Sequence, residues 1–361
     1  MFTHHGGRHR ADVAVPAQAQ GPGPEAYAEG GVRRRAGREP YLDNVKFVAI
    51  TLVVFGHAVW SLSGDRPGRA AYVFVYAFHM PLFVLLSGYL SRNFWRRGTQ
   101  RGLRLFETLL VPYLVFEVAY AVFRKLLGQP FTLSVTEPAW LNWYLLALLL
   151  WRLSTPVFQR LRAPVTASVL ICLAAGAVSL PAEFSVDRFF GLLPFFVAGL
   201  FVRPRHLAFL HRRAVRAAAA CVLAAAAAAA VLLAPLVKRR WVYFRYEYDT
   251  LGLDVLTGTG MRLATLVIGA VLALAVLALI PRRRTWFSSL GSRTLYVYLL
   301  HGFVVLAARE LGWLDLPWMR GPEGVAVIAV SSLAVAVTLS SPPVRSAARW
   351  IVEPPARALF R

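Results

Sequence analysis

Long apolar runs, separated by short polar or basic segments, follow one another along most of this 361-residue chain. Most runs have the length, about 20 residues, that an α-helix needs to cross a hydrocarbon core. The pattern predicts an all-α, polytopic membrane helix bundle of about ten transmembrane helices. The expected spans are residues 44–63, 71–90, 105–127, 138–155, 164–181, 187–203, 214–236, 261–280, 288–310 and 323–344.

Composition agrees with this class, and the charge pattern adds a topology. Hydrophobic residues make up 57% of the chain, a surplus that a soluble domain of this length would not carry. The formal net charge is +22, but alternate spans place the basic segments 33–38, 92–104, 203–216 and 281–284 on one side. Such asymmetry is typical of cytoplasmic loops. It predicts cytoplasmic N- and C-termini in a multi-pass protein of the cell (plasma) membrane, with the lipid bilayer, and no nucleic acid, as partner.

The chain divides into three expected regions. Residues 1–38 are rich in Gly, Pro, Ala, His and Arg and lack the apolar core of a signal peptide, so we expect a disordered basic cytoplasmic tail. Residues 39–345 form the membrane domain, and 346–361 form a short cytoplasmic tail. Cys172 and Cys221 fall inside expected spans, which argues against a disulfide framework.

The first span carries ionisable residues where an apolar helix would be expected. Lys46 and His57 are eleven positions apart, so on a helix they point in nearly the same direction, about 16 Å apart along the axis. Asp43 precedes Lys46 by three positions and lies within reach of it. Titratable groups inside a bilayer usually face a bundle interior or a wet cavity. Lys46 has a simpler interpretation, because it can pair with Asp43 and extend to the interface.

Two further histidines, His79 and His301, are expected at the depth of His57 on other helices. Each is a packing residue or part of a site. A neutral imidazole can accept a proton near pH 7 and activate a hydroxyl. A lysine nearer the cytoplasm could hold the anionic head of a long donor such as a coenzyme A thioester. We expect no metal, because no Asp or Glu lies at this depth and the spacings match no ligand motif.

Several motifs follow one another along the chain: "YLDNVKFVAITLVVFGH" (41–57), "FHMPLFVLLSGYL" (78–90), "RLFETLLVPYL" (104–114), "WYLLALLLWRL" (143–153) and "LGSRTLYVYLLHGF" (290–303). In this order they resemble the acyltransferase 3 family of integral membrane acyltransferases, and within it the group similar to fucose 4-O-acetylase. The resemblance implies a bundle of about ten helices that moves an acyl group, usually acetyl from acetyl-CoA, to a hydroxyl.

The resemblance also assigns roles to residues. The family's basic residue followed by ten others and a histidine falls on Lys46 and His57, which implies His57 as the catalytic base. Lysine replaces the commoner arginine and lacks its bidentate fork. With Lys46 and Asp43, Arg101 and Arg104 are candidates for binding the phosphates of acetyl-CoA, although both arginines also suit ordinary anchoring at the cytoplasmic surface.

Aromatic residues supply the candidates for the acceptor site. Trp143 and Tyr144 either line the acceptor path or sit at the membrane interface. Tyr298, like His79 and His301, could position the acceptor or stabilise an oxyanion. The outer loop 237–260, dense in aromatic and charged residues, is either an interfacial belt or a stacking surface for a sugar.

The sequence thus predicts an O-acyltransferase that carries no permanent cofactor and uses acyl-CoA as its donor substrate. The acceptor would be a glycan, a lipid-linked sugar or a small metabolite. His57 would deprotonate the acceptor hydroxyl or carry the acyl group transiently, and the sequence leaves both open. A transporter or exporter with the histidines as a proton relay is the alternative. A structural or sensory membrane protein is a second one.

Overall fold

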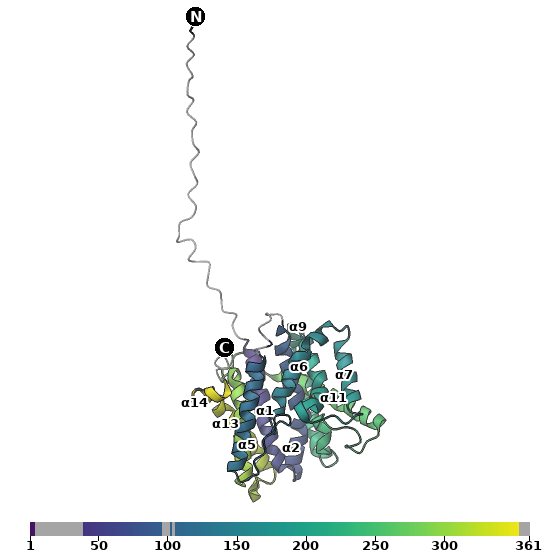
Figure 1. The fold of residues 1–361 in the computed structure, drawn as a ribbon. Helices are drawn as coiled ribbons and strands as arrows, with labels where there is room; N and C mark the ends of the chain where they lie inside the picture. The colour runs from purple at the N-terminus through teal and green to yellow at the C-terminus, as the bar shows by residue number, and fades with distance from the viewer. Residues whose placement is uncertain (4–38, 96–101, 103–104, 354–361) are drawn as a thin grey trace. The chain divides into compact units, whose positions relative to one another are not determined.

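The computed structural model describes residues 1–3, 39–95, 102 and 105–353. The chain divides into two units, Met1–Glu39 and Pro40–Arg361. The expected disordered tail lies mostly outside the described residues. The described part of the second unit is helical and has no β-strand (Figure 1). Its α-helices are α1 (Pro40–Val59), α2 (Arg66–Tyr76), α3 (His79–Ser91), α5 (Val111–Leu126), α6 (Trp143–Arg160), α7 (Pro164–Ala175), α8 (Val186–Phe201), α9 (Pro204–Leu210), α10 (Arg213–Leu233), α11 (Val255–Leu279), α12 (Thr294–Glu310), α13 (Pro322–Leu339) and α14 (Pro342–Val352).

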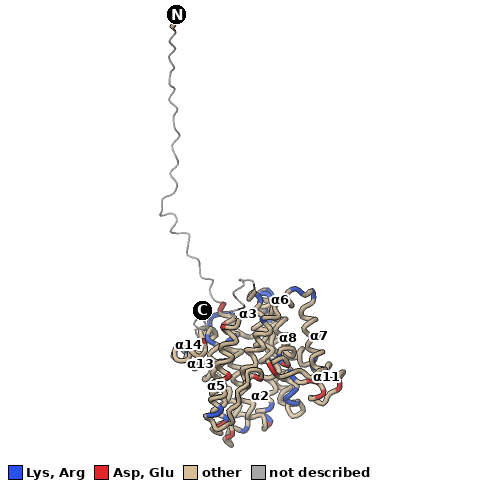
Figure 2. Tube along the Cα trace, viewed as in Figure 1, with Lys and Arg blue, Asp and Glu red and all other residues tan. Residues whose placement is uncertain are grey.

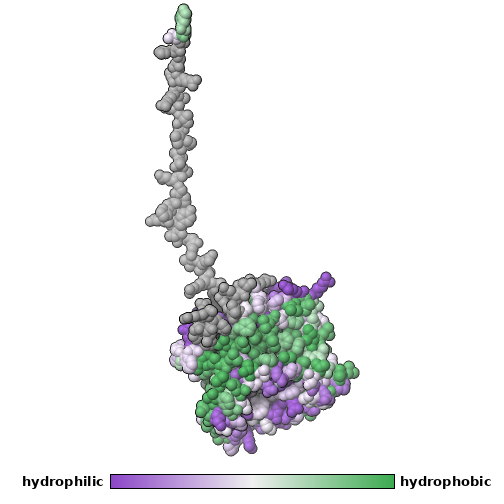
Figure 3. All heavy atoms as spheres, in the orientation of Figure 1, coloured by the Kyte–Doolittle hydropathy of each residue, from purple (hydrophilic) through white to green (hydrophobic). Residues whose placement is uncertain are grey.

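Among the described residues, eight helical segments are long and apolar enough to cross a membrane. An apolar band covers the middle of the face shown in Figure 3, and Lys and Arg gather toward the two ends of the bundle in Figure 2. These findings confirm the all-α membrane bundle. The eight segments are Pro40–Leu62, Arg66–Ser91, Phe106–Leu126, Glu183–Phe201, Arg213–Leu233, Val255–Leu279, Leu290–Glu310 and Pro322–Leu339.

The other two of the ten expected spans form helices of a different kind. The span expected at 138–155 is α6, whose second half carries Arg152, Gln159 and Arg160 and is therefore less apolar. The span expected at 164–181 is α7, which has 12 residues and so a length of about 18 Å, short of a full crossing.

The outer loop packs where α7 ends. The backbone N–H of Tyr248 donates to Gly176 O (2.8 Å), and its hydroxyl donates to Leu173 O (2.8 Å). A Cβ at Gly176 or at Gly258 would lie 2.4 or 2.3 Å from the Tyr248 ring, so only glycine leaves room for it at both positions. The early end of α7 and the two glycines thus leave room for the outer loop to pack against the bundle through Tyr248.

Close helix packing builds the rest of the frame. Gly88 of α3 and Gly199 of α8 face each other, and a Cβ on either would approach a carbonyl oxygen of the other helix to 2.0 or 2.1 Å. Small residues of this kind allow membrane helices to pack backbone against backbone. Only Ala219 and Ala230 of the alanine-rich α10 are buried, so this helix lies at the periphery.

We call the two ends of the bundle the Lys46 end and the Trp60 end. Lys46 lies near the start of α1, and Trp60 directly follows its last residue, Val59. The charge pattern predicts that the Lys46 end faces the cytoplasm. The second apolar segment is interrupted between α2 and α3, and His79 begins the second half. One histidine candidate therefore lies at a break in a membrane helix.

Candidate functional site

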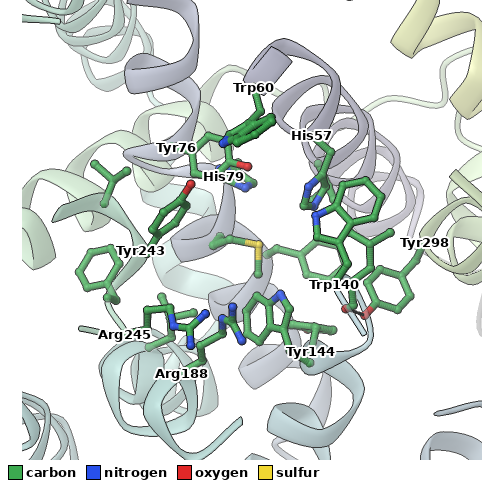
Figure 4. A pocket seen from close by; sticks show the side chains of 18 of the residues that line it. His57, Trp60, Tyr76, His79, Trp140, Tyr144, Arg188, Tyr243, Arg245 and Tyr298 are labelled. Carbon is green, nitrogen blue, oxygen red and sulfur yellow. Dashed lines mark hydrogen bonds between the residues drawn. The ribbon is translucent and has the colours of Figure 1, made fainter. Parts of the chain in front are cut away.

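A cavity of about 390 Å³ lies toward the Trp60 end of the bundle (Figure 4). Helices that are distant in the sequence form its walls, and the outer loop closes one side. Its lining residues are Val53, His57, Trp60, Tyr76, His79, Met80, Phe83, Trp140, Leu141, Trp143, Tyr144, Arg188, Leu192, Val242, Tyr243, Phe244, Arg245, Tyr246, Tyr298 and Arg309.

His57 lies in the last turn of α1 and lines this cavity. Its ring and that of Trp140 are arranged edge to face, with ring centroids 4.9 Å apart. The His301 ring lies beside it at 5.5 Å. Two histidines that are separated by more than 240 positions are thus neighbours inside the bundle.

His79 and His301 share one hydrogen-bonding pattern. Nδ1 of His79 donates to Val75 O (2.9 Å), and Nδ1 of His301 donates to Val297 O (2.8 Å). A carbonyl oxygen can only accept, so each neutral ring carries its proton on Nδ1 and leaves Nε2 as an acceptor. Nε2 of His301 is buried and has no hydrogen-bond partner among the described residues. His79 lines the cavity, where its Nε2 can accept a hydrogen bond from a hydroxyl group, whereas His301 lies beside His57 and does not line the cavity.

The turn before α6 places Trp140 against His57. Oε1 of the buried Glu117 accepts hydrogen bonds from the backbone N–H of Ala139 (2.8 Å) and from Nδ2 of Asn142 (2.9 Å). Trp140, between these two anchors, has a φ of +30°, which is rare for a residue with a side chain. Glu117 thus holds a strained turn that places the Trp140 indole against His57, the candidate base.

The three aromatic candidates from the sequence also line the cavity. The Tyr298 hydroxyl donates to Leu141 O (2.5 Å), so its single proton is used and it can only accept from a ligand. The Tyr144 hydroxyl is hydrogen-bonded to Ser87 Oγ. Trp143 lies under the guanidinium of Arg188, 4.9 Å from its ring centroid.

The wall formed by α8 and the outer loop is one that sequence reasoning did not resolve into residues. Arg245 Nε lies 2.8 Å from Asp187 Oδ2, and Tyr243 accepts a hydrogen bond from Tyr72 (2.6 Å). The only sequence signal for this wall was the density of aromatic and charged residues at 237–260. Five residues of this loop line the cavity, Val242 to Tyr246.

The donor candidates lie elsewhere. Lys46 Nζ is 2.8 Å from Asp43 Oδ1, as the three-residue spacing predicts, and its side chain is 20% exposed. Lys46 does not line the cavity, because it lies about 16 Å from His57 along α1. Arg101 and Arg104 lie outside the described residues. The structure thus gathers the histidine and aromatic candidates in one place and leaves Lys46 and Asp43 at the opposite end of α1.

The described residues contain no group of three or more His, Cys, Asp and Glu side chains arranged to hold a metal ion. Comparison with protein families identifies an acyltransferase domain over residues 39–341. No curated protein and no solved structure matches the chain significantly.

Proposed function

This membrane protein belongs to the acyltransferase 3 family, and from that premise we propose that it transfers acetyl from acetyl-CoA to an acceptor hydroxyl. One observation carries the proposal: His57 and His79 line a cavity large enough for a small acceptor, and the His301 ring lies 5.5 Å from that of His57. Membership of the group similar to fucose 4-O-acetylase, and a place in the cell membrane, are part of the same proposal.

In the proposed mechanism His57 is the general base. It takes the proton of the acceptor hydroxyl while the oxygen attacks the thioester carbonyl. The tetrahedral intermediate then collapses, the carbon–sulfur bond breaks, and the departing thiolate of coenzyme A takes up the proton. Nε2 of His79, which lines the cavity, accepts a hydrogen bond from the acceptor and turns the reacting hydroxyl toward His57. His301 does not line the cavity, and its ring packs beside His57 and orients it. Neutral rings in this tautomer cannot donate from Nε2, so neither ring is assigned to the oxyanion.

The donor is proposed to enter from the Lys46 end. Asp43 uses one of the three Nζ protons of Lys46, which leaves two for phosphate oxygens of coenzyme A. Arg101 and Arg104 would add positive charge there. The separation of Lys46 and His57 along α1, about 16 Å, suits a long donor whose charged head stays at the surface while its thioester reaches His57.

The test is acetyl transfer from radiolabelled acetyl-CoA in inverted membrane vesicles supplied with a panel of sugars. His57→Ala is expected to lower the transfer rate at least 100-fold, the usual contribution of a general base. Lys46→Ala is expected to raise the KM for acetyl-CoA and leave kcat largely unchanged. His206→Ala, which removes an exposed histidine outside the cavity, is the matched control.

Native rates in both His57→Ala and Lys46→Ala would refute the mechanism. Flux of a sugar across the vesicle membrane without acetyl-CoA would support the transporter alternative instead. A labelled protein that loses its label with His57→Ala would indicate that the acyl group passes through an acyl-histidine.

A further inference from the structure

The cavity wall away from His57 carries more positive than negative charge. Arg188 and Arg245 lie next to each other there, as Figure 4 shows. Asp187 neutralises Arg245 through a 2.8 Å ion pair. The Arg188 guanidinium forms no ion pair with any described carboxylate, and its aromatic neighbour is Trp143 at 4.9 Å. One elementary positive charge on this wall is therefore uncompensated within the described structure.

This charge is unfavourable for the protein alone. Arg188 lies in the first turn of α8, where the helix dipole favours anions over cations. It also faces a second arginine inside a membrane domain, where an unpaired charge is costly. Ionisable groups inside a membrane serve function more often than stability. This indicates that an anionic ligand pairs with Arg188.

The shape of the wall shows which ligand would do so. A guanidinium presents a planar fork of N–H donors that matches a carboxylate or a phosphate. The Arg188 guanidinium lies over the Trp143 ring, 4.9 Å from its centroid, and the Arg245 guanidinium lies 5.1 Å from the centroid of the Tyr246 ring. The cavity volume, about 390 Å³, is within the range of small-molecule sites.

We propose that the acceptor bears an oxyanion, a carboxylate or a phosphate, which Arg188 and Arg245 bind across the cavity from His57. The inference rests on the proposed function and narrows it. The arginines hold the charged group, the aromatic walls hold the sugar ring, and the hydroxyl to be acylated points to His57. Neutral sugars would bind weakly, because they leave the charge of Arg188 uncompensated.

The first test measures binding without turnover. Purified protein in lipid nanodiscs is titrated with glucose, glucuronate, glucose 6-phosphate and inorganic phosphate. At least one oxyanion probe is expected to bind ten times more tightly than glucose, and the better of glucuronate and glucose 6-phosphate identifies the group. Arg188→Gln is expected to abolish this preference and Arg188→Lys to retain part of it. Arg320→Gln, which removes an exposed arginine outside the cavity, is expected to leave the preference unchanged.

Equal binding of all probes, or an anion preference that survives in folded Arg188→Gln protein, would overturn the inference. So would an Arg188→Gln variant that raises the KM for acetyl-CoA, because the arginines would then belong to the donor. Transfer to neutral sugars that depends on His57 but shows no anion preference would overturn this inference and leave the proposed function standing. Anion binding that depends on Arg188, in a protein without transfer, would support the site and refute the acyltransferase mechanism.

Discussion

Replacing Glu117 by leucine tests whether this buried carboxylate keeps Trp140 in place against His57, the candidate base, by holding the turn that carries it. Glu117 is 3% exposed and touches neither His57 nor the volume of the cavity. Its Oε1 accepts two hydrogen bonds from the turn that carries Trp140, and Trp140 in turn lies against His57. Leucine keeps the apolar bulk of the side chain and removes the acceptor.

The structure sets the size of the effect. The substitution leaves the Ala139 N–H and the Asn142 amide buried without this acceptor, and each unsatisfied group costs about 1–3 kcal/mol. Two unsatisfied groups would lower the unfolding free energy by about 2–6 kcal/mol. Release of the strained Trp140 backbone, which costs about 1–3 kcal/mol to hold, offsets part of this loss. We expect the turn to relax and the indole to leave His57.

The assay compares Glu117→Leu with Glu117→Gln, whose amide oxygen can still accept both hydrogen bonds. Melting temperatures in detergent report stability, and acetyl transfer at saturating acetyl-CoA reports the site. We expect the leucine variant to melt lower and to lose at least tenfold in kcat, with the KM for acetyl-CoA unchanged. If the leucine and glutamine variants had the same melting temperature and kcat, Glu117 would not be what holds the turn.

Two further predictions concern the frame of the site. Gly199→Val places side-chain atoms where α3 and α8 meet backbone to backbone, so we expect a large loss of folded protein in size-exclusion chromatography, which a normal elution profile would contradict. The buried Arg262 donates to Tyr246 O and to Cys172 O, so Arg262→Ala is expected to free the outer loop. The KM for the acceptor should then rise severalfold while the KM for acetyl-CoA stays constant, and an unchanged acceptor KM would show that the loop needs no such anchor.

The sequence predicts correctly those features that depend on the residues of a single helix. Hydropathy is a sum over neighbouring residues, so the apolar runs identified the membrane segments. The fixed rise of a helix also predicts a common depth for the three histidines, and a three-residue spacing predicts the pairing of Lys46 with Asp43, which the structure confirms. The exception is 164–181, where hydropathy predicts a full crossing and α7 ends after 12 residues.

Only the tertiary structure decided which side chains share the cavity. Arg188 and Arg245 belong to elements 57 positions apart, and nothing local to either marks them as neighbours. The position of Trp140 depends on a carboxylate from another helix, and the backbone strain that results has no signature in the sequence. A sequence fixes the depth of a residue along its own helix, because rise per residue is constant. The partner of that residue depends on how the helices rotate and pack, which contacts spread over the whole bundle determine together.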